Sequence, residues 1–384
     1  MNKIKNICVK TIAICLILVF VSNTFVFANS NLKIYSRSYI SYERNTKTIL
    51  FGKKINEKVP MASTTKIMTA ILLLEYGNLE EYAVASKKAQ ATTGQQLNLK
   101  EGDKISLNDL LYAIMLYSAN DGAVVIAEHI GGSVEGFCQI MNEKAKSIGC
   151  QNTNFTSPHG LDNINHYSTP YDLALITDYA LKISEFKKIT STKNYTIQIN
   201  GNNRDIRNTN RLVHENNNIT GTKTGYTNNA LYCLVANKVE GDKDVIVVVL
   251  GANTSNQRFN ETREILNYSL KEYEIINIKD YIKDYIEINV IKGDNEIYKI
   301  TPKNIPVLCI GKLDKEKIDI NYFILNNLFA PIKEGDVLGI ADILINNKRV
   351  GRVEYVTKLY IKKKTNIDYF FNILENMGDY LKIN

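Results

Sequence analysis

The chain has 384 residues, of which 45% are hydrophobic and 23% charged, and its formal net charge is +7. This length and composition suit two domains with sizeable cores and exclude a disordered or fibrous protein. The charges are dispersed and no basic groove is interleaved with aromatic residues, which argues against a nucleic-acid partner.

Residues 1–28 have the pattern of a secretory signal peptide. Lys3, Lys5 and Lys10 precede an apolar run, and Val26-Phe27-Ala28 supplies a small-residue cleavage site. The run is short for a retained spanning helix, although an uncleaved anchor stays open. Removing these three lysines and no acids lowers the formal charge from +7 to +4. The sequence therefore predicts a secreted, extracytoplasmic protein, and its mildly basic charge is compatible with an anionic cell wall or the outer face of the cytoplasmic membrane.

Residues 38–42 and 47–52 are predicted strands, and a helix is predicted to begin at Ser63, after Pro60. Ser63 and Lys66 are three residues apart, so on a helix they share a face and their side chains can meet. A serine at a helix start also lies among outward-pointing N–H groups that can hold an oxyanion. The alternative is an ordinary N-cap, because the same spacing recurs at Ser30 and Ser184.

A second polar signal lies between two predicted apolar helices. Ser106 has the features of an N-cap for a helix that ends near Tyr117, and another helix is predicted over 123–130. Between them, Ser118 and Asn120 form a short polar turn that should be held deep in the protein. The alternative is a turn stabilised only by local hydrogen bonds.

Further helices are predicted over 136–148 and 170–183, with a polar loop between them that contains His159, Asp162 and His166. No zinc-type spacing accompanies these residues, so we expect neither a metal nor a cofactor, and His159 is interpreted as a loop-packing residue. The four cysteines beyond residue 28 form no CxxC pair and are expected to be buried free thiols.

The third signal is Lys223-Thr224-Gly225-Tyr226 in a strand-rich stretch. The strands at 231–236 and 245–250 follow, which places Lys223 to Gly225 near one end of an antiparallel sheet. Lys223 and Thr224 supply a cation and a hydroxyl for a carboxylate, and Gly225 permits close approach of a ligand. An exposed strand lysine is the plain alternative.

A helix over 257–271 should close the first domain. Residues 277–360 are predicted to form a small all-β domain without catalytic groups, including a hairpin of 334–339 with 343–351. Residues 361–384 have apolar side chains at helical spacing after three lysines, which suits an amphipathic membrane anchor or a helix packed on the β domain.

Taken together and in this order, the three signals resemble the low-molecular-mass penicillin-binding proteins, the D-alanyl-D-alanine carboxypeptidases of the S11 peptidase family. The stretches Ser157-Pro158-His159-Gly160-Leu161 and Ala330-Pro331-Ile332-Lys333-Glu334-Gly335 extend the resemblance over nearly all of the mature chain. It implies an α/β (α+β) fold of the serine β-lactamase and transpeptidase type, with an antiparallel sheet and a helical subdomain at 29–276, followed by the β-sandwich-like domain.

The resemblance implies removal of the terminal D-alanine from peptidoglycan stem peptides through a Ser63 acyl-enzyme, with β-lactams as covalent inhibitors. Lys66 would be the base and Ser118 the proton relay. Lys223, Thr224, Asn120 and Gly225 would bind substrate, and Tyr226 would share the oxyanion hole with Ser63. Some relatives carry histidine where this chain has Tyr226, a departure that leaves the backbone role intact.

Two other functions share part of this pattern. A class A β-lactamase shares the motifs, but no glutamate-x-x-leucine-asparagine sequence lies between the second and third of them. A non-catalytic wall-binding module has no need of Ser63, Lys66 and Ser118. Endopeptidase activity on cross-linked wall stays open as a variant of the first function.

Overall fold

The computed structural model describes residues 32–215, 219–370 and 374, so the predicted signal peptide lies outside the described residues. The chain forms two compact units. The N-terminal unit holds the described residues up to Ile275 together with Cys309–Lys312, and the C-terminal unit holds Ile276–Leu308 and the described residues from Leu313 onward. None of the described helices is long and apolar enough to span a membrane.

The N-terminal unit is built on a five-stranded antiparallel sheet with strand order β2-β1-β9-β8-β7. Its strands are β1 Ser38–Glu43, β2 Thr48–Lys53, β7 Ile219–Thr227, β8 Leu231–Glu240 and β9 Lys243–Ala252. Every residue of β9 from Val245 to Ala252 is buried, as expected for a β-branched central strand that is covered on both faces. The predicted antiparallel sheet is confirmed, and Lys223 lies on its edge strand.

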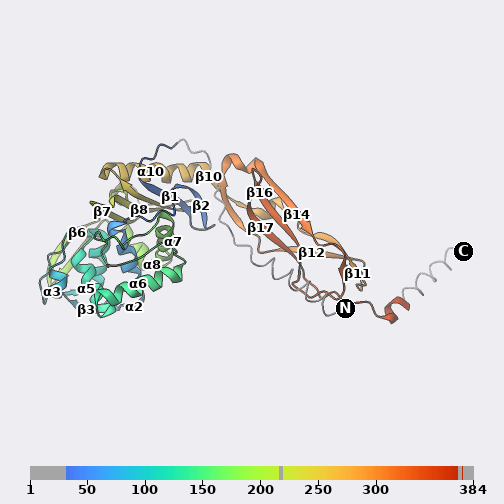
Figure 1. Cartoon of the computed structure of the whole chain (residues 1–384), viewed down its shortest axis with the longest axis horizontal. Coiled ribbons are helices and arrows are strands. Elements are labelled where there is room, and N and C mark those ends of the chain that lie inside the picture. Colours follow the sequence, from blue (N-terminus) through green and yellow to red (C-terminus); the bar gives the residue numbers. More distant parts are fainter. Residues whose placement is uncertain (1–31, 216–218, 371–373, 375–384) are drawn as a thin grey trace. The chain divides into compact units, whose positions relative to one another are not determined.

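Helices cover both faces of this sheet. Helix α10 (Ser255–Glu272) packs on β8 and β9, and α7 (Pro170–Ala180) and α8 (Ser184–Ser191) pack on the opposite face (Figure 1). Helix α2 (Lys66–Tyr76) runs among the other helices and is buried from Lys66 to Leu73. A helix that is apolar on all sides belongs in such a position.

The remaining elements of this unit are two further helices of three to four turns and several short helices, turns and strands. They are η1 Ala62–Thr65, β3 Tyr82–Val84, α3 Lys87–Gln90, β4 Lys104–Ser106, α4 Leu107–Tyr112, η2 Ala113–Tyr117, α5 Asn120–Gly131, α6 Val134–Ile148, β5 Asn194–Ile199, β6 Asn202–Arg207 and α9 Arg211–Glu215. The elements α3, α8, α9 and the β5–β6 hairpin are not predicted from the sequence, because short polar elements have little periodicity to detect. Ser106 caps α4 as predicted, and its hydroxyl accepts from the Asp109 N–H at 3.0 Å.

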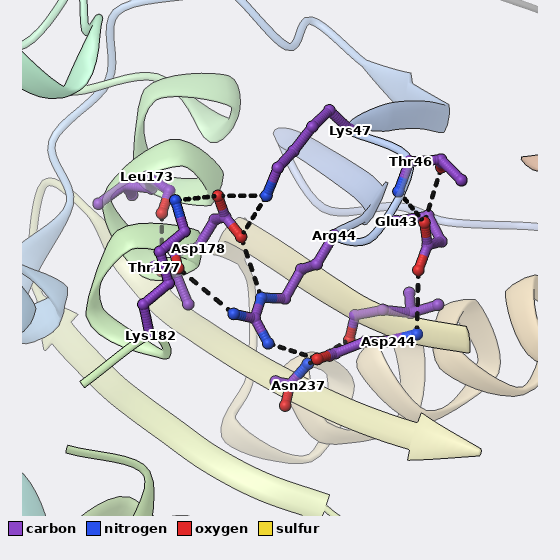
Figure 2. A network of polar contacts seen from close by, with 11 residues as sticks. Glu43, Arg44, Thr46, Lys47, Leu173, Thr177, Asp178, Lys182, Asn237 and Asp244 are labelled. Atoms are coloured by element: carbon purple, nitrogen blue, oxygen red, sulfur yellow. Dashed lines mark hydrogen bonds and ion pairs between the residues drawn. The ribbon is translucent and has the colours of Figure 1, made fainter. Parts of the chain in front are cut away.

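A partly buried ionic network joins the β1–β2 turn to the rest of the unit (Figure 2). Arg44 donates to Asp178 of α7 at 3.1 Å and also pairs with Asp244 of β9. Lys47 reaches the same Asp178 at 2.8 Å, and Glu43 accepts from the Asp244 N–H at 3.1 Å. One helix and two strands are thereby tied together on the face that α7 covers.

The C-terminal unit is a six-stranded sheet with order β14-β16-β17-β12-β11-β15. Its strands are β11 Ile286–Ile291, β12 Ile297–Lys303, β14 Ile318–Ile324, β15 Leu328–Phe329, β16 Val337–Ile345 and β17 Lys348–Thr357, while η3 (Ile278–Tyr281) and η4 (Lys312–Lys317) are single turns. The chain crosses between the units within β10 (Tyr273–Asn277), within β13 (Val307–Gly311) and again between Lys312 and Leu313 in η4. The predicted all-β character is confirmed.

The predicted hairpin of 334–339 with 343–351 places the turn at the wrong residues. Ile340, Ala341 and Asp342 continue β16, and the turn falls at Asn346 and Asn347, with φ of 51° and 62°. Two consecutive asparagines tolerate the left-handed conformation that a tight hairpin turn requires. Helical residues begin again at 366, but most of the predicted amphipathic tail lies outside the described residues.

Candidate active site

Ser63 lies on the single turn η1, and Lys66 begins helix α2 directly after it. The Lys66 Nζ donates to the Ser63 Oγ at 3.0 Å, so the predicted contact across one turn is present. Ala62, immediately before the serine, has a φ of +48°, a left-handed conformation that is costly for a residue with a Cβ. The serine is therefore presented on a strained turn, as is common at functional sites.

Lys66 is completely buried, and its three N–H donors meet three neutral oxygens. Besides Ser63, it donates to the Asn120 Oδ1 at 2.7 Å and to the His159 carbonyl oxygen at 2.9 Å. Burial and the charge of Lys223 hold the pKa of Lys66 well below its ordinary value, against an opposing contribution from Asp121. The lowered pKa favours the neutral amine, which can accept a proton from Ser63.

The Ser118–Asn120 turn follows η2, a π-type turn whose extra residue redirects the chain. Ser118 adopts a φ of +72°, and Asn120 begins helix α5. The Asn120 Nδ2 donates to the Thr93 carbonyl oxygen at 2.7 Å, which together with the Lys66 contact fixes the amide orientation. Gly94 makes room for it, because a Cβ there would lie 2.7 Å from Nδ2.

The loop that contains His159 and His166 braces the Ser63 turn. The His166 Nδ1 accepts from the Thr156 N–H at 3.0 Å, so its Nε2–H donates to the Thr65 Oγ1 at 2.8 Å. Thr65 in turn donates to the Ala62 carbonyl oxygen at 2.8 Å. Burial lowers the pKa of His166 to about 4 and that of His159 to about 3, so both rings stay neutral.

Lys223 lies on β7 just after a bulge in the β7–β8 pairing. Bulges next to active sites commonly redirect a side chain. Lys223 is 1% exposed, and its Nζ donates to the Thr224 carbonyl oxygen at 2.9 Å. Burial and the neighbouring Arg258 charge lower its pKa to about 7. The Thr224 hydroxyl lies 2.7 Å from that of Thr209.

Gly225 is where β7 meets the serine turn. A Cβ at Gly225 would lie 3.0 Å from the Ser63 nitrogen, so glycine permits η1 to pack on the strand. Arg258 of α10 donates to the Gly225 carbonyl oxygen at 2.9 Å and fixes the strand from behind. The Tyr226 ring is half exposed and packs on Tyr232, with 4.4 Å between ring centroids.

The structure brings part of the predicted site together at the serine turn, and Ser118 lies buried directly before the Asn120 helix without a hydrogen bond to Ser63 or Lys66 among the described residues. Ser63, Lys66 and Asn120 are linked directly by hydrogen bonds, and Lys223 acts on Lys66 through its charge. Sequence reasoning considered His166 only as a metal ligand and did not foresee its contact with Thr65, and it gave Asp121 no role. The Asp121 carboxylate accepts from the backbone N–H groups of Leu97 and Leu99 at 3.0 and 3.1 Å. The sequence signal for Asp121 is its position in the first turn of α5, because acidic residues are favoured there.

Two family matches cover most of the chain. Residues 25–254 match the S11 peptidases, described as D-alanyl-D-alanine carboxypeptidase, and residues 279–363 match the C-terminal domain of penicillin-binding protein 5. The chain belongs to the S11 family of D-alanyl-D-alanine carboxypeptidases. An S11 carboxypeptidase is a serine hydrolase that forms an acyl-enzyme with its substrate and is also acylated by penicillin. The enzyme class predicted from the sequence is therefore confirmed.

Individual S11 relatives agree with this assignment. The chain is 31% identical over 361 residues to D-alanyl-D-alanine carboxypeptidase DacF of Bacillus subtilis (strain 168), with 92% of each chain covered. The structure of penicillin-binding protein 5 from Haemophilus influenzae superposes with a TM-score of 0.74 at 27% identity, covering 88% of this chain and all of that one. The Streptomyces K15 DD-transpeptidase has a TM-score of 0.60 at 33% identity, covering 62% of this chain and 98% of that one. The predicted fold is confirmed.

Proposed function

We propose that this carboxypeptidase removes the terminal D-alanine from peptidoglycan stem peptides, with Ser63 as nucleophile and Lys66 as its base. The observation that carries the proposal is the contact of the Lys66 Nζ with the Ser63 Oγ at 3.0 Å, made by a buried lysine with a lowered pKa. Ser63 attacks the carbonyl between the last two D-alanines while Lys66 takes its proton. The terminal D-alanine leaves, and water hydrolyses the acyl-enzyme.

The neighbouring residues take the remaining roles. Ser118 passes the proton to the leaving amine, and Lys223 with Thr224 binds the terminal carboxylate. One Asn120 Nδ2 hydrogen is used by the Thr93 carbonyl, which leaves the other for the substrate amide. The N–H groups of Ser63 and Tyr226 form the oxyanion hole, and the close packing of Gly225 on the Ser63 turn supports that pairing.

The test is release of D-alanine from a peptide that ends in D-Ala-D-Ala. Ser63→Ala should abolish release, because no acyl-enzyme can form, whereas Ser191→Ala on the exposed surface of α8 should leave it at the wild-type rate. Release by the Ser63→Ala protein at the wild-type rate would refute the assignment. Transfer of the acyl group to an added amine would indicate transpeptidation, and rapid loss of a penicillin adduct would indicate a β-lactamase.

The proposal extends to the arrangement of the chain. Residues 1–28 direct export, residues 29–276 perform catalysis outside the cytoplasmic membrane, and 277–360 form a separate β domain. Residues 361–384 contact the membrane surface through Lys362, Lys363, Lys364 and the apolar side chains that follow. Deleting 362–384 should abolish sedimentation with anionic liposomes and spare D-alanine release. Undiminished sedimentation would refute the anchor.

A further inference from the structure

A groove of about 490 Å³ opens beside the serine turn in the N-terminal unit. Its walls come from Lys58 and Pro60, just before η1, from Asp162 and Tyr167 in the bracing loop, and from Asn229 after β7. The roles of Ser63, Lys66 and Lys223 do not use these side chains. His166 lines the same groove and also holds Thr65, so one wall of the groove is tied directly to the nucleophile turn.

The direction of β7 determines which part of a substrate reaches this groove. Lys223 and Thr224, the proposed carboxylate site, come first along the strand, and Gly225 packs against the Ser63 nitrogen. Thr227 comes last, and its hydroxyl donates to the Asp162 Oδ1 at 2.6 Å. A substrate that runs from the carboxylate site past Ser63 therefore continues towards Asp162. At about 3.3 Å per residue, Thr227 lies about one to two residues beyond the attacked carbonyl.

The groove carries one negative side chain, Asp162, and one positive side chain, Lys58. Both are positioned by contacts with uncharged groups. Asp162 accepts from the Thr227 hydroxyl and from the Asn229 N–H at 3.3 Å, so its negative charge is positioned but not neutralised. The Lys58 ammonium lies 4.9 Å from the centroid of the Tyr167 ring, a cation–π contact that leaves its positive charge in place. Among the described residues, no ion pair within 4.0 Å joins either side chain to another charged group.

We propose that this groove binds the side chain of the residue that precedes the acyl D-alanine, and that it selects a side chain ending in both an ammonium and a carboxylate. Asp162 takes the ammonium and Lys58 takes the carboxylate. The inference rests on the proposed function, because the direction in which the substrate lies follows from binding of its terminal carboxylate at Lys223. A side chain with an ammonium alone satisfies only Asp162, and one with neither charge satisfies neither group.

The experiment compares kcat/KM for D-alanine release from N-acetylated peptides X-D-Ala-D-Ala. X is meso-2,6-diaminopimelate, its side-chain amide, L-lysine or Nε-acetyl-lysine. We expect the diaminopimelate peptide to exceed the amide and lysine peptides by about fivefold, the effect of one partly exposed ion pair, and the acetyl-lysine peptide by more. Equal kcat/KM for all four peptides would overturn the inference.

Two variants separate the two charges. Lys58→Gln should remove the preference for diaminopimelate over its amide and keep the preference for lysine over acetyl-lysine. Asp162→Asn should remove the second preference and, because asparagine still accepts from Thr227, keep the loop in place. The matched controls Lys187→Gln and Asp242→Asn change exposed charges elsewhere and should preserve both preferences. Preferences that survive in Lys58→Gln and Asp162→Asn would also overturn the inference.

Acylation of the wild-type protein by benzylpenicillin is measured first. The acyl side chain of this drug is uncharged, so its reaction with Ser63 does not depend on the charges of the groove. Absence of a Ser63 adduct would mean that the proposed function itself fails. A Ser63 adduct together with equal rates on the four peptides would leave the proposed function standing and refute only the groove.

Discussion

The chemistry at Ser63 depends on two buried lysines that need opposite charge states. Lys66 must be neutral to take the serine proton, whereas Lys223 must be charged to attract a carboxylate. Burial lowers the pKa of both, and the Lys223 charge lowers that of Lys66 further. Because the two groups interact, the observed titration steps belong to the pair. The pH range for activity is therefore the interval in which one lysine has lost its proton and the other has kept it.

This coupling predicts an alkaline decline in kcat/KM near pH 7 for D-Ala-D-Ala peptides. The pKa of Lys223 is lowered to about 7, so its cation is present below that pH and is lost as the pH rises through it. The kcat/KM profile reports the free enzyme, in which no bound carboxylate stabilises the cation. Initial rates at low substrate between pH 5 and 10 measure the decline.

Lys223→Arg provides the matched comparison. Arginine keeps its charge throughout this range, so the alkaline decline should move to higher pH even if the larger side chain lowers the overall rate. An unchanged position of the decline in Lys223→Arg would show that another group causes it.

At the scale of elements, the serine turn is clamped between a strand and a loop. Gly225 of β7 packs on the Ser63 backbone from one side. From the other side, Gly160 lies so close that a Cβ there would meet the Ala62 carbonyl oxygen at 2.0 Å and the Thr65 Oγ1 at 2.6 Å. Together with the His166–Thr65 contact, these approaches maintain the left-handed conformation of Ala62. Ser63 is positioned by packing as well as by hydrogen bonds.

We predict that Gly160→Ala damages both stability and acylation, whereas Gly149→Ala affects stability alone. Both glycines have left-handed φ, of 88° and 105°, so either alanine should cost about 1–2 kcal/mol. At Gly149 the added Cβ meets open space. At Gly160 it strikes the Ser63 turn, which adds about 1–3 kcal/mol. Displacement of the nucleophile should slow penicillin acylation by about 100-fold.

Urea unfolding and the acylation rate of each variant give the comparison. Equal losses of stability and equal acylation rates in the two variants would show that the Gly160 contact does not position Ser63.

At the scale of the whole molecule, the sequence predicts most of the architecture because its signals are ordered along the chain. Ser63 with Lys66, Ser118 with Asn120, and Lys223 to Gly225 fall on a helix start, an interhelical turn and an edge strand, and the structure has each element in that place. The change to short β segments near residue 277 likewise predicts the second unit, which begins at Ile276.

What sequence reasoning misses depends on contacts between distant segments. The partnership of His166 with Thr65 joins residues 101 positions apart, and no local pattern marks it. The π-type turn before Ser118 and the left-handed Ala62 are imposed by packing, against local preference. The hairpin error at 334–351 has a local cause, because the glycines at 335 and 339 are more conspicuous turn signals than the Asn346-Asn347 pair that forms the turn.

The most direct test of the account is a time course of intact mass for the whole protein mixed with benzylpenicillin, with the adduct located by digestion and fragmentation. We predict one covalent adduct per chain, on Ser63, that persists long after free drug is removed and does not form in Ser63→Ala. A folded sample that forms no adduct, or one that carries it on another residue, would contradict the assignment of Ser63 as the nucleophile.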